Sequence, residues 1–305
     1  MGRLLREVIE KGIHFSPSFA FWSVLWWIGW YNITRLSKLY WFAHSKKQRF
    51  IAIFLKQRHC LPEGSGNVAT ETRDWKIFFF WLQGVDGMPP LVRACYEKIL
   101  KSNGDSVQLI TSRNIKQWVT LPEYLYEKLD KGIITYTHFS DILRVALLSQ
   151  HGGLWVDATC WIPSRIPEWV RNCPCFSPHH NENDWVGWCQ GTNLTHSSFY
   201  DSVLDVFCRY WKQEKLLIDY VFIDYVMRII MDSQPDELQK WQGIPINNIG
   251  RSWLFPLLNQ KFDQEKYDKL LSENFIFKLS YKNKYREYTP EGELTFYGKM
   301  IRSEL

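Results

Sequence analysis

Short, nearly continuous hydrophobic runs alternate with helical stretches through the middle of the chain. Three such runs beside turn residues are expected to form buried strands: KIFFFWL (76–82), SVQLI (106–110) and GLWV (153–156). Helices are expected over 91–101, 121–131, 140–150 and 197–231. Strands that lack polar alternation and alternate with helices predict an α/β fold with a mainly parallel sheet. In such sheets, ligands bind in a crevice beyond the carboxyl ends of the strands.

The N-terminal segment follows a different pattern. Residues 19–31 (FAFWSVLWWIGWY) form a tryptophan-rich apolar run of 13, shorter than the roughly 18–20 residues that span a bilayer. Ten Lys and Arg against two Asp and Glu give residues 1–60 a charge of +8, whereas the rest of the chain carries −3. Tryptophan beside basic residues is typical of a helix in the membrane interface. We therefore expect residues 1–60 to be a helical, membrane-associating segment; the alternative is a helix packed in the core.

The amino-acid composition and the positions of glycine and cysteine limit the class of protein. Residues 61–74 are polar and rich in glycine, as in a linker, so the main domain is expected over 75–305. No small-residue cleavage site follows the apolar run, which argues against a signal peptide. The seven cysteines match neither a disulfide framework nor a zinc pattern, which favours a reducing cytoplasm. The 46% hydrophobic content excludes a disordered chain, and no nucleic-acid-binding module accompanies the basic residues.

Residues 138–159 combine charged side chains with apolar stretches that predict a buried helix and a buried strand. Ser140 is expected to cap a helix, with Asp141 in its first turn and Arg144 on the same face. The other positions of this helix are mostly apolar, so the pair is expected to face a cavity. A surface salt bridge, worth about 0.2–0.5 kcal/mol, is the alternative. The third strand ends at Asp157, where a carboxylate can hold a ribose or a metal bound to a diphosphate.

Five motifs follow one another in order along the chain: WLQG-x-x-x-MPPLV-x-AC (81–95), LPEYL-x-EK (121–128), HFSDILR-x-ALL (138–148), GGLWVDAT (152–159) and LIDY (217–220). Together they resemble the bacterial capsular polysaccharide synthesis protein family. This family is similar to the DXD-containing sugar transferases related to the yeast initiating mannosyltransferase and to the large clostridial glucosylating toxins. The resemblance runs from about residue 76 to about residue 279 and leaves out the N-terminal segment.

The resemblance implies a Rossmann-like glycosyltransferase type A fold, a nucleotide-sugar donor, expected to be UDP-linked, and retention of anomeric configuration. It implies that the Trp81 indole stacks on the donor base, a use that suits an aromatic platform; the alternative is a core tryptophan. It also implies that Asp141 and Arg144 bind the sugar hydroxyls and that Asp157 is the first carboxylate of DXD. The expected donor site is completed by Gln83, Ser140 and Thr159.

The metal is the open point of this site. Thr159 stands where DXD proteins have their second aspartate. A divalent metal on Asp157, Mn²⁺ or Mg²⁺, would have one carboxylate and one hydroxyl, a poorer set of hard oxygen ligands. Lys278, Lys282 and Lys284 are therefore candidates to neutralise the donor diphosphate instead. An exposed charged loop is the alternative explanation of these lysines.

Two further carboxylates lie in the predicted helix over 197–231. Asp219 and Asp224 are five residues apart, about 140° round a helix, so only one of them is expected to face the site. Asp219 lies in the LIDY motif and is our candidate for contacting the acceptor. A base role for Asp224 is left open. With Asp157, these two residues form the predicted catalytic set.

These inferences predict a cytoplasmic glycosyltransferase, peripheral or monotopic on the inner face of the cell membrane. It is expected to move a sugar from a nucleotide sugar to a lipid-linked glycan acceptor in capsule or surface-polysaccharide assembly. The alternative is a non-catalytic assembly component that keeps the fold and binds a sugar nucleotide or a partner. The missing second aspartate of DXD is its main support.

Overall fold

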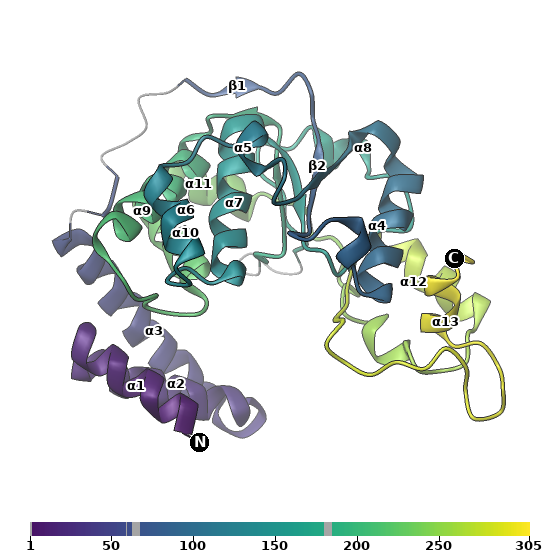
Figure 1. Ribbon diagram of the computed structural model, residues 1–305, viewed down its shortest axis with the longest axis horizontal. Coiled ribbons are helices and arrows are strands. Elements are labelled where there is room, and N and C mark those ends of the chain that lie inside the picture. Colours follow the sequence, from purple (N-terminus) through teal and green to yellow (C-terminus); the bar gives the residue numbers. More distant parts are fainter. Residues whose placement is uncertain (1, 59, 63–67, 180–184) are drawn as a thin grey trace. The chain divides into compact units, whose positions relative to one another are not determined.

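The computed structural model describes residues 2–58, 60–62, 68–179 and 185–305 (Figure 1). The chain forms two compact units from interleaved segments. The helical unit takes residues 1–66, 121–143 and 198–235, and the sheet unit takes residues 67–120, 144–197 and 236–305. These units cut across the linear division into 1–60, a linker and 75–305. Part of the expected linker, residues 63–67, lies outside the described residues.

The helical unit begins with three consecutive helices, α1 (Gly2–His14), α2 (Pro17–Tyr31) and α3 (Ile33–Gln57). The Ser16 hydroxyl caps α2 by accepting from the backbone N–H of Ser18, and Pro17 occupies its first turn. α2 and α3 pack closely at Gly29, where an added Cβ would lie 2.8 Å from the Tyr40 Cα. Among the described residues, no helix has the length and apolar character needed to cross a bilayer.

The rest of the helical unit comes from later in the chain: α6 (Glu123–Asp130), the first half of α7 (Tyr136–His151), α9 (Ser198–Gln213) and α10 (Phe222–Ser233). The helix predicted over 197–231 is therefore wrong in one respect, because a loop separates α9 from α10. Asp219 lies in that loop, so the angle worked out for a continuous helix does not apply to it.

The central sheet of the sheet unit has the strand order β3-β2-β4-β6. Its strands are β2 (Ile77–Phe80), β3 (Val107–Ile110), β4 (Gly153–Val156) and β6 (Cys189–Thr192). β2 runs parallel to both β3 and β4, which confirms the three predicted strands, while β6 pairs antiparallel with β4. The mixed α/β fold class is thus confirmed, with an antiparallel edge strand that the sequence pattern did not predict.

Both faces of this sheet are covered, which explains the lack of polar alternation in its strands. Ile77 and Phe79 of β2 belong to a core that includes residues of α4 (Pro90–Asn103), α12 (Gln264–Glu273) and α13 (Phe296–Ile301). On the opposite face, the Phe78 ring lies 5.7 Å from that of Trp118 and 6.1 Å from that of His151.

Short elements complete the sheet unit. Two pairs of two-residue strands are antiparallel: β1 (Thr70–Glu71) with β7 (Leu194–Thr195), and β5 (Cys160–Trp161) with β8 (Phe277–Lys278). The remaining helices are α5 (Ile115–Trp118), α8 (Glu168–Arg171) and α11 (Pro235–Gln242). The β5–β8 pair brings residues near the C-terminus beside the segment that follows β4, where the candidate site lies.

Candidate functional site

The carboxyl edge of the central sheet holds two of the predicted site residues. Trp81 directly follows β2, and Asp157 directly follows β4. Because β2 and β4 are neighbouring parallel strands, their carboxyl ends lie at the same edge. The backbone N–H of Trp81 donates to the Ile110 carbonyl (3.0 Å), and that of Asp157 donates to the Trp188 carbonyl (2.8 Å). These contacts hold both residues at the edge that the strand pattern predicts for a ligand crevice.

Two cations converge on the Asp157 carboxylate. Lys278 Nζ lies 2.7 Å from Oδ2, and Arg144 Nη2 lies 3.2 Å from Oδ1. The Trp155 Nε1 also donates to Oδ1, at 3.0 Å. The Arg144 side chain is 6% exposed, whereas those of Asp157 and Lys278 are each 29% exposed. This cationic cluster of Arg144, Asp157 and Lys278 carries a net charge of +1 and is partly open to solvent.

The protonation of the cationic cluster follows from its own charges. Burial raises the pKa of Asp157, but the Lys278 ammonium and the Arg144 guanidinium lower it. Their effect outweighs that of burial, so the pKa lies below its ordinary value. Burial lowers the pKa of Lys278, but the attraction of Asp157 outweighs this and leaves it above its ordinary value. Both groups are therefore charged at neutral pH.

Aromatic rings line the same part of the sheet unit. The Trp81 ring meets the Tyr281 ring edge to face at 5.7 Å, and the Trp81 Nε1 donates to the Gly87 carbonyl at 3.0 Å. Lys278 Nζ lies 5.6 Å from the centre of the Trp188 ring. Flat apolar rings beside a net positive charge suit a ligand that has both a planar ring and an anionic group.

The helix that carries Ser140 and Asp141 begins earlier than predicted. α7 starts at Tyr136, and the hydroxyl of Thr135 accepts from the His138 backbone N–H at 3.2 Å. Ser140 is therefore not the cap; its hydroxyl donates to the Thr137 carbonyl at 2.6 Å. Asp141 accordingly lies in the second turn, not in the first.

Asp141 has a partner that the sequence reasoning missed. Its Oδ2 lies 3.5 Å from His138 Nδ1, and both side chains are nearly fully buried. His138 Nε2 accepts from the Trp211 Nε1 at 2.8 Å, so a neutral imidazole carries its proton on Nδ1, facing Asp141. The i,i+3 spacing of His138 and Asp141 was the available signal. Asp141 belongs to the helical unit, and Arg144 belongs to the sheet unit.

The other predicted donor residues differ in exposure. Thr159 is buried, and its carbonyl accepts from the Leu279 backbone N–H at 2.9 Å. Gln83 is exposed in the turn after β2, and Lys282 and Lys284 are exposed in a loop near the C-terminus. Of the three candidate lysines, the structure brings Lys278 into contact with Asp157.

Asp219 and Asp224 lie in the helical unit. Asp219 Oδ2 forms an ion pair with Lys47 Nζ at 2.6 Å, with side chains 6% and 1% exposed. Lys47 Nζ also lies 4.3 Å from the centre of the Trp26 ring. Lys47 is thus buried in α3, whereas the sequence placed it among basic residues for a membrane surface. Asp224 is exposed in the first turn of α10.

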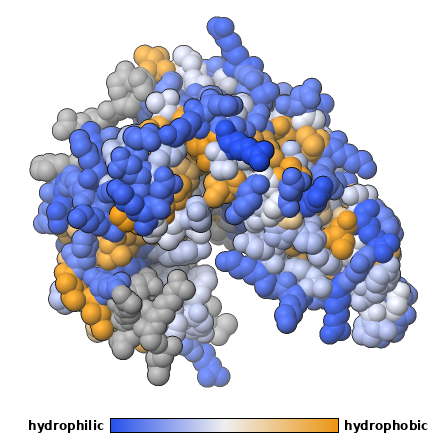
Figure 2. All heavy atoms as spheres, viewed as in Figure 1, coloured by the Kyte–Doolittle hydropathy of each residue, from blue (hydrophilic) through white to orange (hydrophobic). Residues whose placement is uncertain are grey.

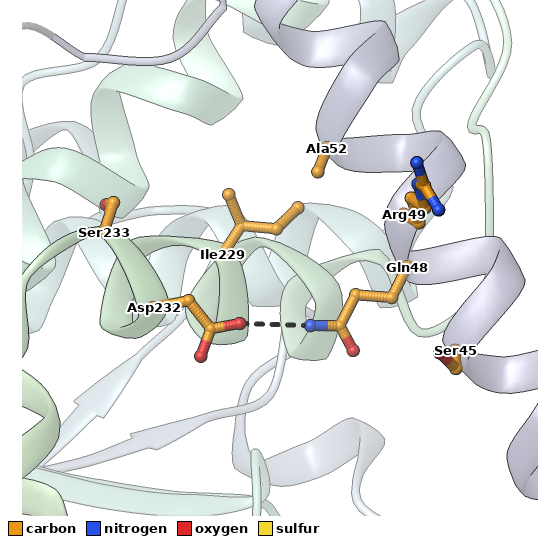
Figure 3. Close-up of a pocket in the computed structure, with 7 residues that line it drawn as sticks. All are labelled: Ser45, Gln48, Arg49, Ala52, Ile229, Asp232 and Ser233. Carbon is orange, nitrogen blue, oxygen red and sulfur yellow. Dashed lines mark hydrogen bonds between the residues drawn. The ribbon is translucent and has the colours of Figure 1, made fainter.

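A groove of about 450 Å³ lies between α3 and α10 (Figure 3). Gln48 Nε2 of α3 donates to Asp232 Oδ2 of α10 across it, at 3.4 Å. The residues that line it are Ser45, Gln48, Arg49, Ala52, Ile229, Asp232 and Ser233. None of the predicted site residues is among them, so this groove is separate from the cationic cluster.

The donor set at Asp157 does not fit a divalent metal. Both carboxylate oxygens already meet cationic donors, and Thr159 adds a hydroxyl in place of a second carboxylate. Within the described ranges, no group of three or more His, Cys, Asp or Glu side chains is arranged to hold a metal ion. Mg²⁺ and Mn²⁺ prefer several hard oxygen ligands, which these residues do not supply.

Comparison with known proteins supports the resemblance read from the motifs. No individual curated protein matches the chain. At the level of families, the match described as capsular polysaccharide synthesis protein covers residues 40–300, which includes all the motifs and every residue of the cationic cluster. The chain therefore belongs to the capsular polysaccharide synthesis protein family.

Proposed function

We propose that this chain is a glycosyltransferase of capsular polysaccharide synthesis. It transfers a sugar from a nucleoside diphosphate donor, UDP-linked, to a lipid-linked glycan acceptor with retention of configuration. The observation that carries the proposal is the cationic cluster at the carboxyl edge of parallel strands, beside Trp81. Membership of the capsular polysaccharide synthesis family supports a role in that process. The strand order β3-β2-β4-β6, with helices on both faces, is consistent with the glycosyltransferase type A fold that we propose.

Each part of the donor has a counterpart in the proposed site. The diphosphate meets the net positive charge of Arg144 and Lys278, where donors aimed at developing charge stabilise a leaving group. The base lies against Trp81, whose indole is held by its bond to the Gly87 carbonyl. Asp157 orients the two cations by accepting from both. Gln83, Ser140, Asp141 and Thr159 stay in the proposal as donor-binding residues on the strength of the resemblance.

The two candidates for contacting the acceptor, Asp219 and Asp224, lie in different surroundings. Asp219 is bonded to a buried lysine, so we propose that its first role is to hold α3 in the helical unit. Asp224 is exposed and stays a candidate for the acceptor.

We also propose that the N-terminal helices attach the protein to the inner face of the cell membrane. Large hydrophobic side chains are exposed along α2 and α3, six of them aromatic: Phe21, Trp27, Trp30, Tyr31, Trp41 and Phe42, between 37% and 68% exposed. Figure 2 shows hydrophobic residues in orange at the lower left, where the N-terminal helices lie in Figure 1. Arg35, Lys38 and Arg49 are exposed on α3 and would face anionic lipid headgroups.

The proposed activity is tested with the full-length protein. Nucleotide sugars are offered one at a time with a lipid-linked glycan extract, and release of the nucleotide is measured. We expect one donor to give turnover in the wild type and none in Asp157→Ala. Glu265→Ala, which changes an exposed carboxylate of α12, is the matched control and should behave as wild type. A wild type that binds nucleotide sugars but turns over none of them would favour the non-catalytic assembly component.

A further inference from the structure

We infer that the proposed sugar transfer needs no divalent metal, because Lys278 occupies the metal's place and binds the donor diphosphate itself. This inference rests on the proposed function and adds the nature of the charge that stabilises the leaving group. A motif with two aspartates would offer a divalent metal two carboxylates beside the diphosphate. In this chain, the contacts of Asp157 point to a different solution.

The first argument is that three donors, two of them cationic, already contact the carboxylate that a metal would need. Lys278 Nζ takes Oδ2 of Asp157 at 2.7 Å. Arg144 Nη2 and Trp155 Nε1 take Oδ1, at 3.2 and 3.0 Å. A divalent cation on this carboxylate would have to displace Lys278 and then sit beside two positive charges. Like charges at such distances repel strongly in a partly buried site, so the metal is disfavoured.

The second argument is that the backbone, and not side-chain flexibility, places Lys278 here. β8 pairs with β5 in a register that sets Lys278 opposite Cys160, directly after the Asp-Ala-Thr motif. The Leu279 backbone N–H donates to the Thr159 carbonyl at 2.9 Å and extends this pairing into the motif. Backbone pairing therefore holds the strand that carries Lys278 beside the segment that carries Asp157, and the lysine is a permanent part of the site.

The third argument concerns what Lys278 can still bind. An ammonium group has three N–H donors, and the bond to Asp157 uses one of them. The side chain is 29% exposed, so the remaining donors can reach a ligand. Lys278 Nζ also lies over the face of the Trp188 ring, 5.6 Å from its centre. With Arg144 the cluster keeps a net charge of +1, which complements a diphosphate.

The reaction then balances without a metal. The bond between the anomeric carbon and the diphosphate oxygen breaks, and its electron pair goes to that oxygen. The acceptor hydroxyl oxygen forms the new bond to the anomeric carbon on the same face, and its proton passes to the departing diphosphate. Lys278 and Arg144 stabilise the negative charge that grows on the diphosphate, a role for which preorganised cations are suited.

The experiment measures nucleotide binding and donor turnover in the full-length protein, in metal-stripped buffer with EDTA and again with added Mn²⁺ or Mg²⁺. The binding probes are UDP and GDP, each compared with its phosphate-free nucleoside. We expect the wild type to bind one nucleoside diphosphate, and to release it from its donor, within twofold of the same values with and without metal.

Lys278→Ala should weaken binding of that diphosphate at least tenfold and leave binding of the nucleoside unchanged, because the lost contact is to phosphate. Lys278→Arg should recover part of the loss. Lys266→Ala, an exposed lysine on α12, is the matched control and should equal wild type. If Lys278→Ala does not fold, Lys278→Gln keeps the length of the side chain without its charge and replaces it in every comparison.

Three contrary outcomes are distinguishable. Binding and turnover that vanish in EDTA and return with Mn²⁺ would overturn the inference and leave the proposed function standing. No binding of any nucleotide or nucleotide sugar, with or without metal, would overturn the proposed function itself. Equal loss of diphosphate and nucleoside binding in the Lys278 variants would mean that the lysine only supports the fold, which also contradicts the inference.

Discussion

Breaking the buried ion pair of Lys47 and Asp219 should destabilise the helical unit strongly. The two atoms are 2.6 Å apart, and the side chains are 1% and 6% exposed. Removing one partner of a buried pair leaves an uncompensated charge, at a cost of about 3–5 kcal/mol. Because each 1.4 kcal/mol is about a tenfold change in an equilibrium constant, the equilibrium constant of unfolding should rise by about two to three and a half powers of ten.

The two single variants should differ, because the partners have different secondary contacts. Lys47→Met leaves the Asp219 carboxylate with the Val221 backbone N–H at 3.1 Å. Asp219→Asn leaves the Lys47 ammonium over the Trp26 ring at 4.3 Å, and such contacts stabilise a desolvated cation by about 2 kcal/mol. We therefore expect Lys47→Met to lose more stability than Asp219→Asn. The double variant Lys47→Met/Asp219→Leu should lose less than Lys47→Met alone, since no charge is left buried.

Urea unfolding followed by far-ultraviolet circular dichroism measures the loss, and amide hydrogen exchange of α3 and α10 locates it in the helical unit. Lys56→Met, at an exposed position of α3, is the matched control. Single variants that unfold at the wild-type urea concentration would refute the argument. An Asp219→Asn protein with wild-type stability but no transferase activity would instead return Asp219 to the acceptor site, as the sequence predicted.

Four further outcomes follow from the structure. Asp157→Asn should reduce transfer at least tenfold at unchanged thermal stability of the helical unit, measured by nucleotide release and by hydrogen exchange. The pKa of Asp157 lies below its ordinary value, so its contribution to stability is present at neutral pH and is lost as the pH falls through that lowered pKa; acid titration of wild type against Asp157→Asn checks this. Gly29→Val should cost about 1–3 kcal/mol of stability, because a side chain there meets the backbone of α3, and thermal unfolding measures it. Replacing both Trp27 and Trp30 by serine should weaken flotation with anionic liposomes at low salt while nucleotide binding stays unchanged; equal flotation of the variant would count against the proposed membrane surface.

A deletion of residues 1–60 is a poor test of membrane attachment. Lys47 is buried against α10 residues, and the deletion would leave Asp219 without its cation. The truncated helical unit is therefore expected to unfold, whatever the role of the exposed aromatic side chains. Substitutions on the exposed face of α2 avoid this difficulty.

The sequence predicted the parts of the fold that have strong local signals. The strands around Phe79 and Trp155 were visible because both faces of the sheet are covered and every position is apolar. The placement of Trp81 and Asp157 at one edge followed from the parallel order of those strands. These inferences needed no information from distant parts of the chain.

The missed features depend on distant contacts or on single hydrogen bonds. Two-residue strands such as β5 and β8 have no periodicity, so their pairing, which fixes Lys278, could not be found by pattern. Lys47 lies in a basic stretch and was indistinguishable from surface lysines before its partner was known. The start of α7 was misplaced because the hydroxyl that accepts from the His138 N–H belongs to Thr135 and not to Ser140, and both residue types are common helix caps.

The sequence separation within the cationic cluster has a consequence for biosynthesis. Lys278 reaches Asp157 across 121 residues, whereas Arg144 is only 13 residues away. At roughly 5–20 residues per second, translation leaves Asp157 without its lysine for about 6–24 s after it is made. During that time, burial of the Asp157 carboxylate without the Lys278 cation would cost free energy, so the carboxylate should stay hydrated. A ribosome-stalled chain that ends before β8 should therefore contain the central strands but bind no nucleotide, which makes the binding site one of the last features of this protein to mature.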